Sequence, residues 1–128
     1  LTSWSANATD GTANPMQQFL SAADRNDFAA VESILDSKLK DAGGRWMSPS
    51  DFVKKISNCY LRRVYDDRIS QRLLATWMCD EGEGKSRVIV ATLGTHAGKV
   101  QLVVDLENRN NRPAPARAGS AFGEEPKP

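Results

Sequence analysis

Residues 85–107, KSRVIVATLGTHAGKVQLVVDLE, decide the fold class of this chain. A glycine-bounded turn separates two strand-forming runs here, Lys85–Leu93 and Lys99–Glu107. Because the connection is short, the two strands are expected to be antiparallel neighbours. The second run alternates apolar and polar residues, which predicts a half-buried strand, whereas the first is apolar on both faces and is expected to lie centrally in the sheet.

Two further strand-like runs precede this stretch, Cys59–Asp66 and Ile69–Asp80. Turns are predicted at Asp67-Arg68 and over residues 81–84, so the four runs form a curved antiparallel meander. Helical spacing also continues through residues 49–66, and one long helix there would reduce the sheet to three strands.

Helical patterns occupy the first half of the chain. Pro15 suits the first position of a helix, and residues 27–41 carry apolar side chains at helical spacing. Ser48 and Asp51 form a capping-box variant that predicts a third helix ending near Asn58. Helices followed by strands indicate an α+β domain with N-terminal helices packed on a curved antiparallel sheet.

The domain is expected to span residues 15–107. Residues 1–14 are small and polar and are predicted to be a flexible leader, and residues 108–128 a flexible Pro/Ala-rich tail. The 17 basic and 16 acidic residues nearly balance, so composition gives no reason to expect nucleic-acid binding. No apolar run is long enough for membrane insertion.

The two cysteines are predicted to pair across the first hairpin. A turn at Asp67-Arg68 sets Cys59 directly opposite Cys79, within the Cα separation that a disulfide tolerates. The alternative is a pair of buried thiols. A disulfide, together with a chain that starts at Leu1 without an initiator Met, favours a periplasmic or secreted location. Two cysteines and one distant histidine do not make a zinc site, so no metal is expected.

The segment Phe19–Phe28, FLSAADRNDF, resembles the turn between the first two helices of NTF2-like proteins. Trp46 before the third helix and the terminal strands extend this resemblance over residues 15–107. The superfamily has a cone-shaped α+β fold and includes ketosteroid isomerases and polyketide cyclases. The resemblance implies a pocket between sheet and helices, and a homodimer formed through the sheet.

The most suggestive polar cluster is Arg62-Arg63 between Tyr60 and Tyr65, because arginine binds carboxylate or phosphate through a two-pronged fork. Predicted register places Arg63 on the same face as Tyr65 and Trp77, and these three are our candidate ligand-binding residues. The competing interpretation is that the arginines protect an edge strand from aggregation. Large aromatics such as Trp77 are also typical core residues.

Catalytic residues do not stand out. The single histidine, His96, is expected in a solvated turn, and three aspartates are expected at turns or strand ends: Asp66, Asp67 and Asp80. Signatures of nucleotide-binding and hydrolytic enzymes are absent from the sequence, and no cofactor is expected.

These observations favour a non-enzymatic NTF2-like domain that binds a small molecule or a protein partner in the concavity of its sheet. Two alternatives remain open. One is an isomerase- or cyclase-type enzyme with an Asp general base in the same pocket, and the other is a structural dimerisation module. A carboxylate inside the pocket would favour the enzyme, an open polar concavity without an ionisable group would favour the binding module, and a filled interior would favour the structural role.

Overall fold

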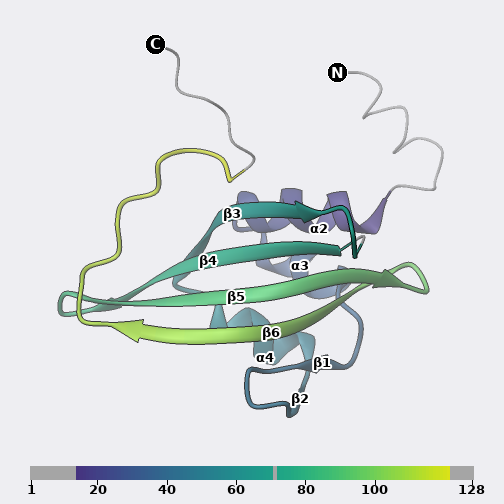
Figure 1. Cartoon of the computed structure of the whole chain (residues 1–128), viewed down its shortest axis with the longest axis horizontal. Coiled ribbons are helices and arrows are strands. Elements are labelled where there is room, and N and C mark those ends of the chain that lie inside the picture. Colours follow the sequence, from purple (N-terminus) through teal and green to yellow (C-terminus); the bar gives the residue numbers. More distant parts are fainter. Residues whose placement is uncertain (1–13, 71, 122–128) are drawn as a thin grey trace.

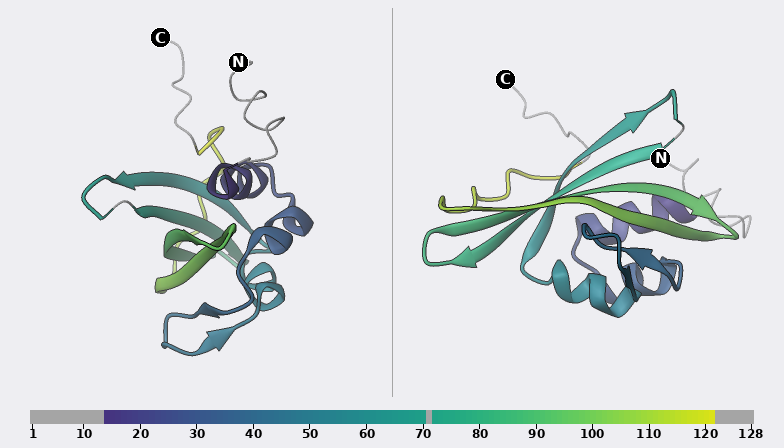
Figure 2. Two further views of the ribbon diagram at one scale, coloured as in Figure 1. Left: turned by 90° about the vertical axis from the view of Figure 1, so that its right-hand side faces the viewer. Right: turned by 60° about the horizontal axis from the view of Figure 1, so that its bottom comes forward.

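The computed structural model describes residues 14–70 and 72–121 of the chain. One layer of helices covers one face of a six-stranded mixed sheet that does not close into a barrel (Figures 1 and 2). The predicted α+β class is therefore confirmed. Within the described residues, no helix is long and apolar enough to cross a membrane.

Each of the three helices that the structure describes in residues 14–70 and 72–121 begins at a side-chain cap. Helix α2 (Pro15–Asp24) follows Asn14, whose Oδ1 accepts from the Met16 amide at 2.9 Å. Helix α3 (Phe28–Ile34) is capped by Asp27, and helix α4 (Pro49–Lys55) starts with the predicted capping box of Ser48 and Asp51. Such caps satisfy backbone amides that have no partner inside the helix.

Helix α3 is shorter than the predicted helix over residues 27–41. The chain becomes extended at Leu35, and the Asp36 amide donates to the Val100 carbonyl at 2.8 Å. Residues 35–40 therefore follow the neighbouring sheet edge, where backbone groups gain partners that an isolated helix end lacks. This segment contains strand β1 (Leu39–Lys40), and strand β2 (Trp46–Met47) pairs with it; the sequence analysis missed both.

The four long strands are β3 (Cys59–Asp67), β4 (Arg72–Gly82), β5 (Lys85–His96) and β6 (Lys99–Asn110). Their antiparallel pairing confirms the predicted meander and excludes the long-helix alternative. The sheet order is β2-β1-β6-β5-β4-β3, with β1 parallel to β6, so β5 is central as predicted and β3 is an edge strand.

Two tight turns fix the register of the long strands. Glu83 and Gly84 have φ angles of 54° and 73°, and Ala97 and Gly98 have φ angles of 53° and 78°. Positive φ at both central residues is the geometry of the type I′ hairpin turn, which matches the twist of the flanking strands. The predicted turn over residues 94–98 is thus wider than the observed one.

The hydrophobic core lies between the helices and the sheet. Its largest fully buried side chains come from all three helices or their flanks and from every long strand: Trp77, Phe19, Phe52, Leu39, Ile56, Leu61, Ile89, Leu93, Leu102, Val31, Val100 and Val104. The opposite face of the sheet, here called the outer face, has none of the helices of the described residues over it (Figure 2, left).

Residues 111–121 run from the end of β6 back past β3 to α2 (Figure 1). The predicted domain end at Glu107 falls inside β6, which continues to Asn110. Of the predicted leader over residues 1–14, only Asn14 is among the described residues. The flexibility of both terminal segments stays a prediction.

Candidate functional site

Three aromatic side chains fill the centre of the space between sheet and helices, and a groove of about 490 Å³ remains at its margin, between α2 and Val64 and Leu73 of the sheet. Trp77 is 1% exposed, and its ring centre lies 6.4 Å from that of Phe19 and 5.4 Å from that of Phe52. Both pairs are edge-to-face, an arrangement worth about 0.5–1.5 kcal/mol beyond the burial itself. Trp77 is consequently part of the core and offers no surface to a ligand.

Arg63 and Tyr65 lie on the outer face, so the prediction that they share a face with Trp77 is wrong. Strand β3 pairs Leu61 with Trp77 but Arg63 with Thr76, because a β-bulge shifts the register between Leu61 and Arg63. One extra residue in a strand moves all later side chains to the other face. The bulge inserts Arg62, and this displacement was not visible in the hydrophobic pattern.

A groove of about 650 Å³ lies between β3 and the C-terminal segment 111–121. We call it the β3 groove. Its lining comes from one stretch on each side: Tyr60, Leu61, Arg62, Arg63, Val64 and Asp66 from β3, and Pro115, Ala116, Ala118, Gly119, Ser120 and Ala121 from the C-terminal segment. The arginine pair was singled out from the sequence. The opposite wall was not, because the composition of residues 111–121 predicts disorder.

The C-terminal segment is held at both ends of the β3 groove. Tyr60 Oη donates to the Pro115 carbonyl at 2.8 Å. Asp24, at the end of α2, accepts from Arg117 Nη2 at 2.7 Å, from the Ser120 hydroxyl at 3.0 Å and from the Ala121 amide at 2.9 Å. Asp24 thus fixes the outer wall of the β3 groove through three donors.

The two arginines give the β3 groove an unbalanced positive charge. In residues 14–70 and 72–121, neither Arg62 nor Arg63 makes an ion pair, and Arg63 Cζ lies 6.0 Å from the ring centre of Tyr65. The one carboxylate in the lining, Asp66, lies 3.9 Å from the guanidinium of Arg68. Arg62 and Arg63 are both exposed and so remain accessible to an anion.

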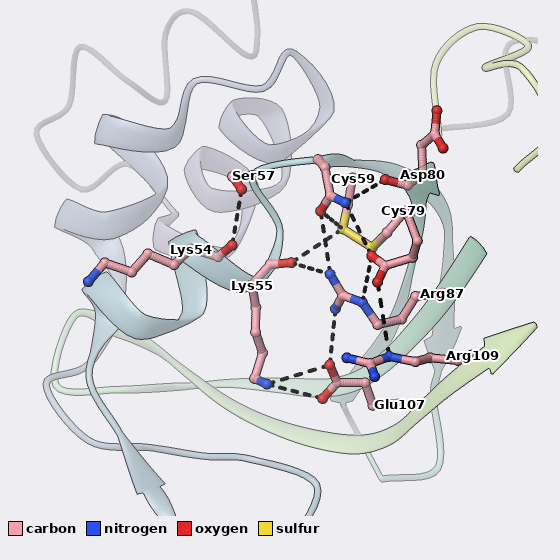
Figure 3. Close-up of a disulfide and its surroundings, with 11 residues drawn as sticks. Lys54, Lys55, Ser57, Cys59, Cys79, Asp80, Arg87, Glu107 and Arg109 are labelled. Atoms are coloured by element: carbon pink, nitrogen blue, oxygen red, sulfur yellow. Dashed lines mark hydrogen bonds and ion pairs between the residues drawn. A yellow bond between two sulfur atoms is a disulfide. The ribbon is translucent and has the colours of Figure 1, made fainter. Parts of the chain in front are cut away.

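The predicted disulfide between Cys59 and Cys79 is present, and the two residues are directly paired in the β3–β4 ladder. Beside it lies Arg87, a buried arginine whose side chain is 9% exposed (Figure 3). Its guanidinium donates to Glu81 Oε2 at 3.1 Å, to Glu107 Oε2 at 3.0 Å and to the Lys55 carbonyl at 3.0 Å. This cluster could not be predicted from the sequence because its members are far apart in the chain.

Both carboxylates of the Arg87 cluster, Glu81 and Glu107, form ion pairs. A hydrogen bond from Asn58 and the neighbouring Arg87 lower the pKa of Glu81 below its ordinary value. Glu107 also accepts from Lys55 Nζ at 3.1 Å. A general base needs a carboxylate whose pKa is raised toward neutrality, so the pKa of Glu81 is shifted in the wrong direction for that role.

Three other candidate residues lie at the surface. Asp67 caps the β3–β4 turn, where bonds from Ser70 and Ile69 lower its pKa, and Asp80 accepts from the Gly82 amide. His96 ends β5, and its side chain is 67% exposed, with Nδ1 at 3.9 Å from Asp36 Oδ2. Among the described residues, no three His, Cys, Asp or Glu side chains gather as a metal site.

Comparisons with known proteins support the fold. No protein-family model matches the chain, and no curated protein matches it. An NTF2-like protein of unknown function from Burkholderia xenovorans LB400 superposes with a TM-score of 0.50 at 15% identity, over 81% of this chain and 85% of that one. At this identity the likeness is one of fold, and it confirms the NTF2-like resemblance.

Two further solved structures are similar. An NTF2-like protein of unknown function from Cytophaga hutchinsonii ATCC 33406 gives a TM-score of 0.49 at 11% identity, over 73% of this chain and 87% of that one. A polyketide cyclase candidate from Xanthomonas campestris pv. campestris gives 0.46 at 15% identity, over 70% and 85%. These similarities do not establish an activity for the present chain.

Proposed function

We propose that this chain is a non-enzymatic binding module that takes an extended acidic segment of a partner protein into the β3 groove. The observation that carries the proposal is the pair of arginines, Arg62 and Arg63, which line the groove without a carboxylate partner among the described residues. A guanidinium binds a carboxylate through two parallel hydrogen bonds, and this supports recognition of Asp or Glu side chains.

The shape of the β3 groove supports an extended occupant. Strand β3 is the last strand of the sheet, and its lining residues run from Tyr60 to Asp66. Seven residues of a strand span about 23 Å at the usual rise per residue. An added peptide strand gains backbone hydrogen bonds from such an edge, while side-chain contacts select its sequence.

An isomerase- or cyclase-type enzyme is the alternative, and it has less support. It requires an Asp base in a pocket, whereas Trp77, Phe19 and Phe52 occupy the centre of the interior and the groove between α2 and the sheet is lined by no Asp or Glu. The partly buried carboxylates Glu81 and Glu107 are bound to Arg87, and Asp67 and Asp80 act in turns.

A periplasmic or secreted location belongs to the same proposal. The disulfide between Cys59 and Cys79 supports it, because such bonds persist mainly in oxidising compartments. A partner would then be another exported protein or an exposed segment of a membrane protein.

The proposal is tested with a fluorescein-labelled peptide of alternating Glu and Val, seven residues long, titrated with protein and followed by fluorescence anisotropy. Arg62→Gln with Arg63→Gln should weaken binding about tenfold or more, since each lost charge-assisted contact costs on the order of 1 kcal/mol. Lys85→Gln, which removes an exposed cation from the β4–β5 hairpin, should leave the affinity unchanged.

Amide hydrogen exchange separates strand addition from diffuse charge attraction. Peptide binding should slow exchange at β3 amides between Tyr60 and Asp66, and a Lys/Val peptide of equal length should have no effect. Equal loss of binding in the double variant and in Lys85→Gln, or unchanged exchange along β3, would refute the proposal.

Homodimerisation through the outer face is a second candidate role, and it can coexist with peptide binding. Val103 and Leu106, both on β6, are 40% and 43% exposed on the outer face. Contiguous exposed apolar residues often mark an interaction surface.

A further inference from the structure

A second groove, of about 480 Å³, runs across strands β5 and β6 from the β1–β2 hairpin to the β3–β4 turn. We call it the Trp46 groove. The β1–β2 hairpin and the preceding residue supply one wall with Lys38, Lys40 and Trp46; Ser70 and Arg72 supply the other. The floor is formed by strands β5 and β6: Thr92, Gly94, Thr95, Gln101, Leu102 and Val103.

Trp46 is unusually exposed for a tryptophan. It retains 65% of its accessible surface, although a large aromatic residue gains more from burial than almost any other side chain. Its neighbours are cations, with Lys40 Nζ at 4.7 Å and Lys38 Nζ at 5.9 Å from the ring centre. The wall thus presents an indole ring together with two ammonium groups.

The charge of the Trp46 groove is positive and unbalanced. Lys38 and Lys40 carry no ion pair in the part of the chain that the structure describes, and the same holds for Arg72 on the facing wall. Two carboxylates touch the lining: Asp105 accepts a hydrogen bond from the Thr92 hydroxyl, and Asp67 accepts one from the Ser70 hydroxyl. Three cations therefore face the groove against two carboxylates that are already hydrogen-bonded.

Gly94 leaves space in the middle of the groove floor. A Cβ atom added there would meet no heavy atom within 4 Å, so the absence of a side chain is not required by packing. The other neighbours on the floor, including Gln101 and Val103, flank this gap. A flat group can approach the strand backbone there, as it can wherever glycine lines a strand.

We infer that the Trp46 groove binds a planar aromatic carboxylate. The ring would stack on the indole of Trp46 over Gly94, and the carboxylate would pair with Lys40 or with the fork of Arg72. An aliphatic acid lacks the stacking surface, and a neutral aromatic lacks the charge. The groove is distinct from the β3 groove and stands independently of the function proposed there.

The probe is 1-naphthoate, titrated into the full chain carrying Trp4→Phe, with tryptophan emission as the signal. Trp77 is buried, so a ligand at the Trp46 groove should quench the red-shifted emission of Trp46. Isothermal titration calorimetry provides an affinity that does not depend on fluorescence. Saturable quenching at millimolar or lower concentration is the expected result, with no effect from acetate or naphthalenemethanol at equal concentration.

Two variants test the location. Gly94→Val should fold, because its added side chain has room and suits a strand, yet it should weaken naphthoate binding about tenfold or more by filling the floor. Arg72→Gln should weaken binding about threefold to fivefold, the contribution of one exposed ion pair. Lys54→Gln on helix α4 is the charge-matched control and should bind as the parent protein does.

Several outcomes would overturn the inference. Acetate binding as tightly as naphthoate would mean a site for simple anions, and naphthalenemethanol binding as tightly would mean an uncharged apolar site. Unchanged naphthoate affinity in Gly94→Val, with native circular dichroism, would place the ligand elsewhere.

Discussion

Arg87 joins three parts of the molecule that are distant in sequence. It bonds Glu81 on β4, Glu107 on β6 and the carbonyl of Lys55 at the end of α4. Arg87→Leu should lower the free energy of unfolding by about 3 kcal/mol, because the change leaves partly buried carboxylates without their cation. Guanidinium denaturation measures this loss.

Arg109→Leu is the matched control for Arg87. The Arg109 side chain is 79% exposed and lies 4.0 Å from Glu81 Oε1. Its loss should cost under about 0.5 kcal/mol, as is usual for a surface ion pair. Equal effects of the two substitutions would show that burial of Arg87 does not strengthen the cluster.

The lowered pKa of Glu81 predicts how stability depends on pH. The pKa of Glu81 is lower in the folded protein than in the unfolded chain, so ionised Glu81 stabilises the fold. This stabilisation is complete above the unfolded pKa, about 4.3, and is lost as the pH falls through the folded pKa. Glu81→Gln should therefore lose less stability than the parent between neutral pH and pH of about 3. The check is the denaturation midpoint measured across this pH range. The control Glu32→Gln, at an exposed position on α3, should show the same dependence of the midpoint on pH as the parent protein.

At the scale of elements, the β3–β4 hairpin depends on its disulfide. The bond closes a loop with a sequence separation of 20, so its removal should cost about 3 kcal/mol. Cys59→Ala with Cys79→Ala should show this loss in denaturation against the oxidised parent. Intact mass spectrometry of protein alkylated before reduction should find no modified thiol, and alkylation without reductant would contradict the pairing.

The pairing of Cys59 with Cys79 is confirmed, but the turn from which it was predicted is displaced, because Asp67 lies in β3 and pairs with Arg72. The bulge between Leu61 and Arg63 shifts the register back by one residue, so the sequence predicted the right cysteine pair only through this compensation.

The sequence could not predict the faces of Arg63 and Tyr65, because one inserted residue reverses them without changing local composition. Strands β1 and β2 were missed for a different reason. They are two residues long, and Leu39 continues a helical pattern that contact with β6 interrupts.

The two grooves differ in how far the sequence could predict them. The Arg62-Arg63 pair is contiguous in sequence and was identified, but the wall opposite depends on Asp24 binding a segment about a hundred residues later. The Trp46 groove combines a hairpin, a turn and two strands. Such sites arise from topology, and a single sequence without its fold does not bring their members together.

At the scale of the whole molecule, the two faces of the sheet differ: the described helices pack on one face and leave the other uncovered. The helices cover the inner face, whereas the outer face exposes Val103 and Leu106 beside half-buried Val88 and Val90. An isologous dimer would bury these aliphatic side chains against their counterparts, with the same patch on both subunits; because Val103 also lies in the floor of the Trp46 groove, this dimer and a ligand in that groove compete. Burying two such residues per subunit favours association by on the order of several kcal/mol, against which stands the loss of translational and rotational freedom of the two subunits.

Sedimentation velocity at micromolar concentration should therefore find a dimer. Leu106→Lys should shift the population to monomer, because a dimer would desolvate an unpaired ammonium on each subunit. Gln18→Lys places the same charge on exposed α2, on the helical side of the molecule, and should remain dimeric. A monomeric parent protein would leave the outer face without this role, and a dimeric Leu106→Lys would locate the contact on another surface.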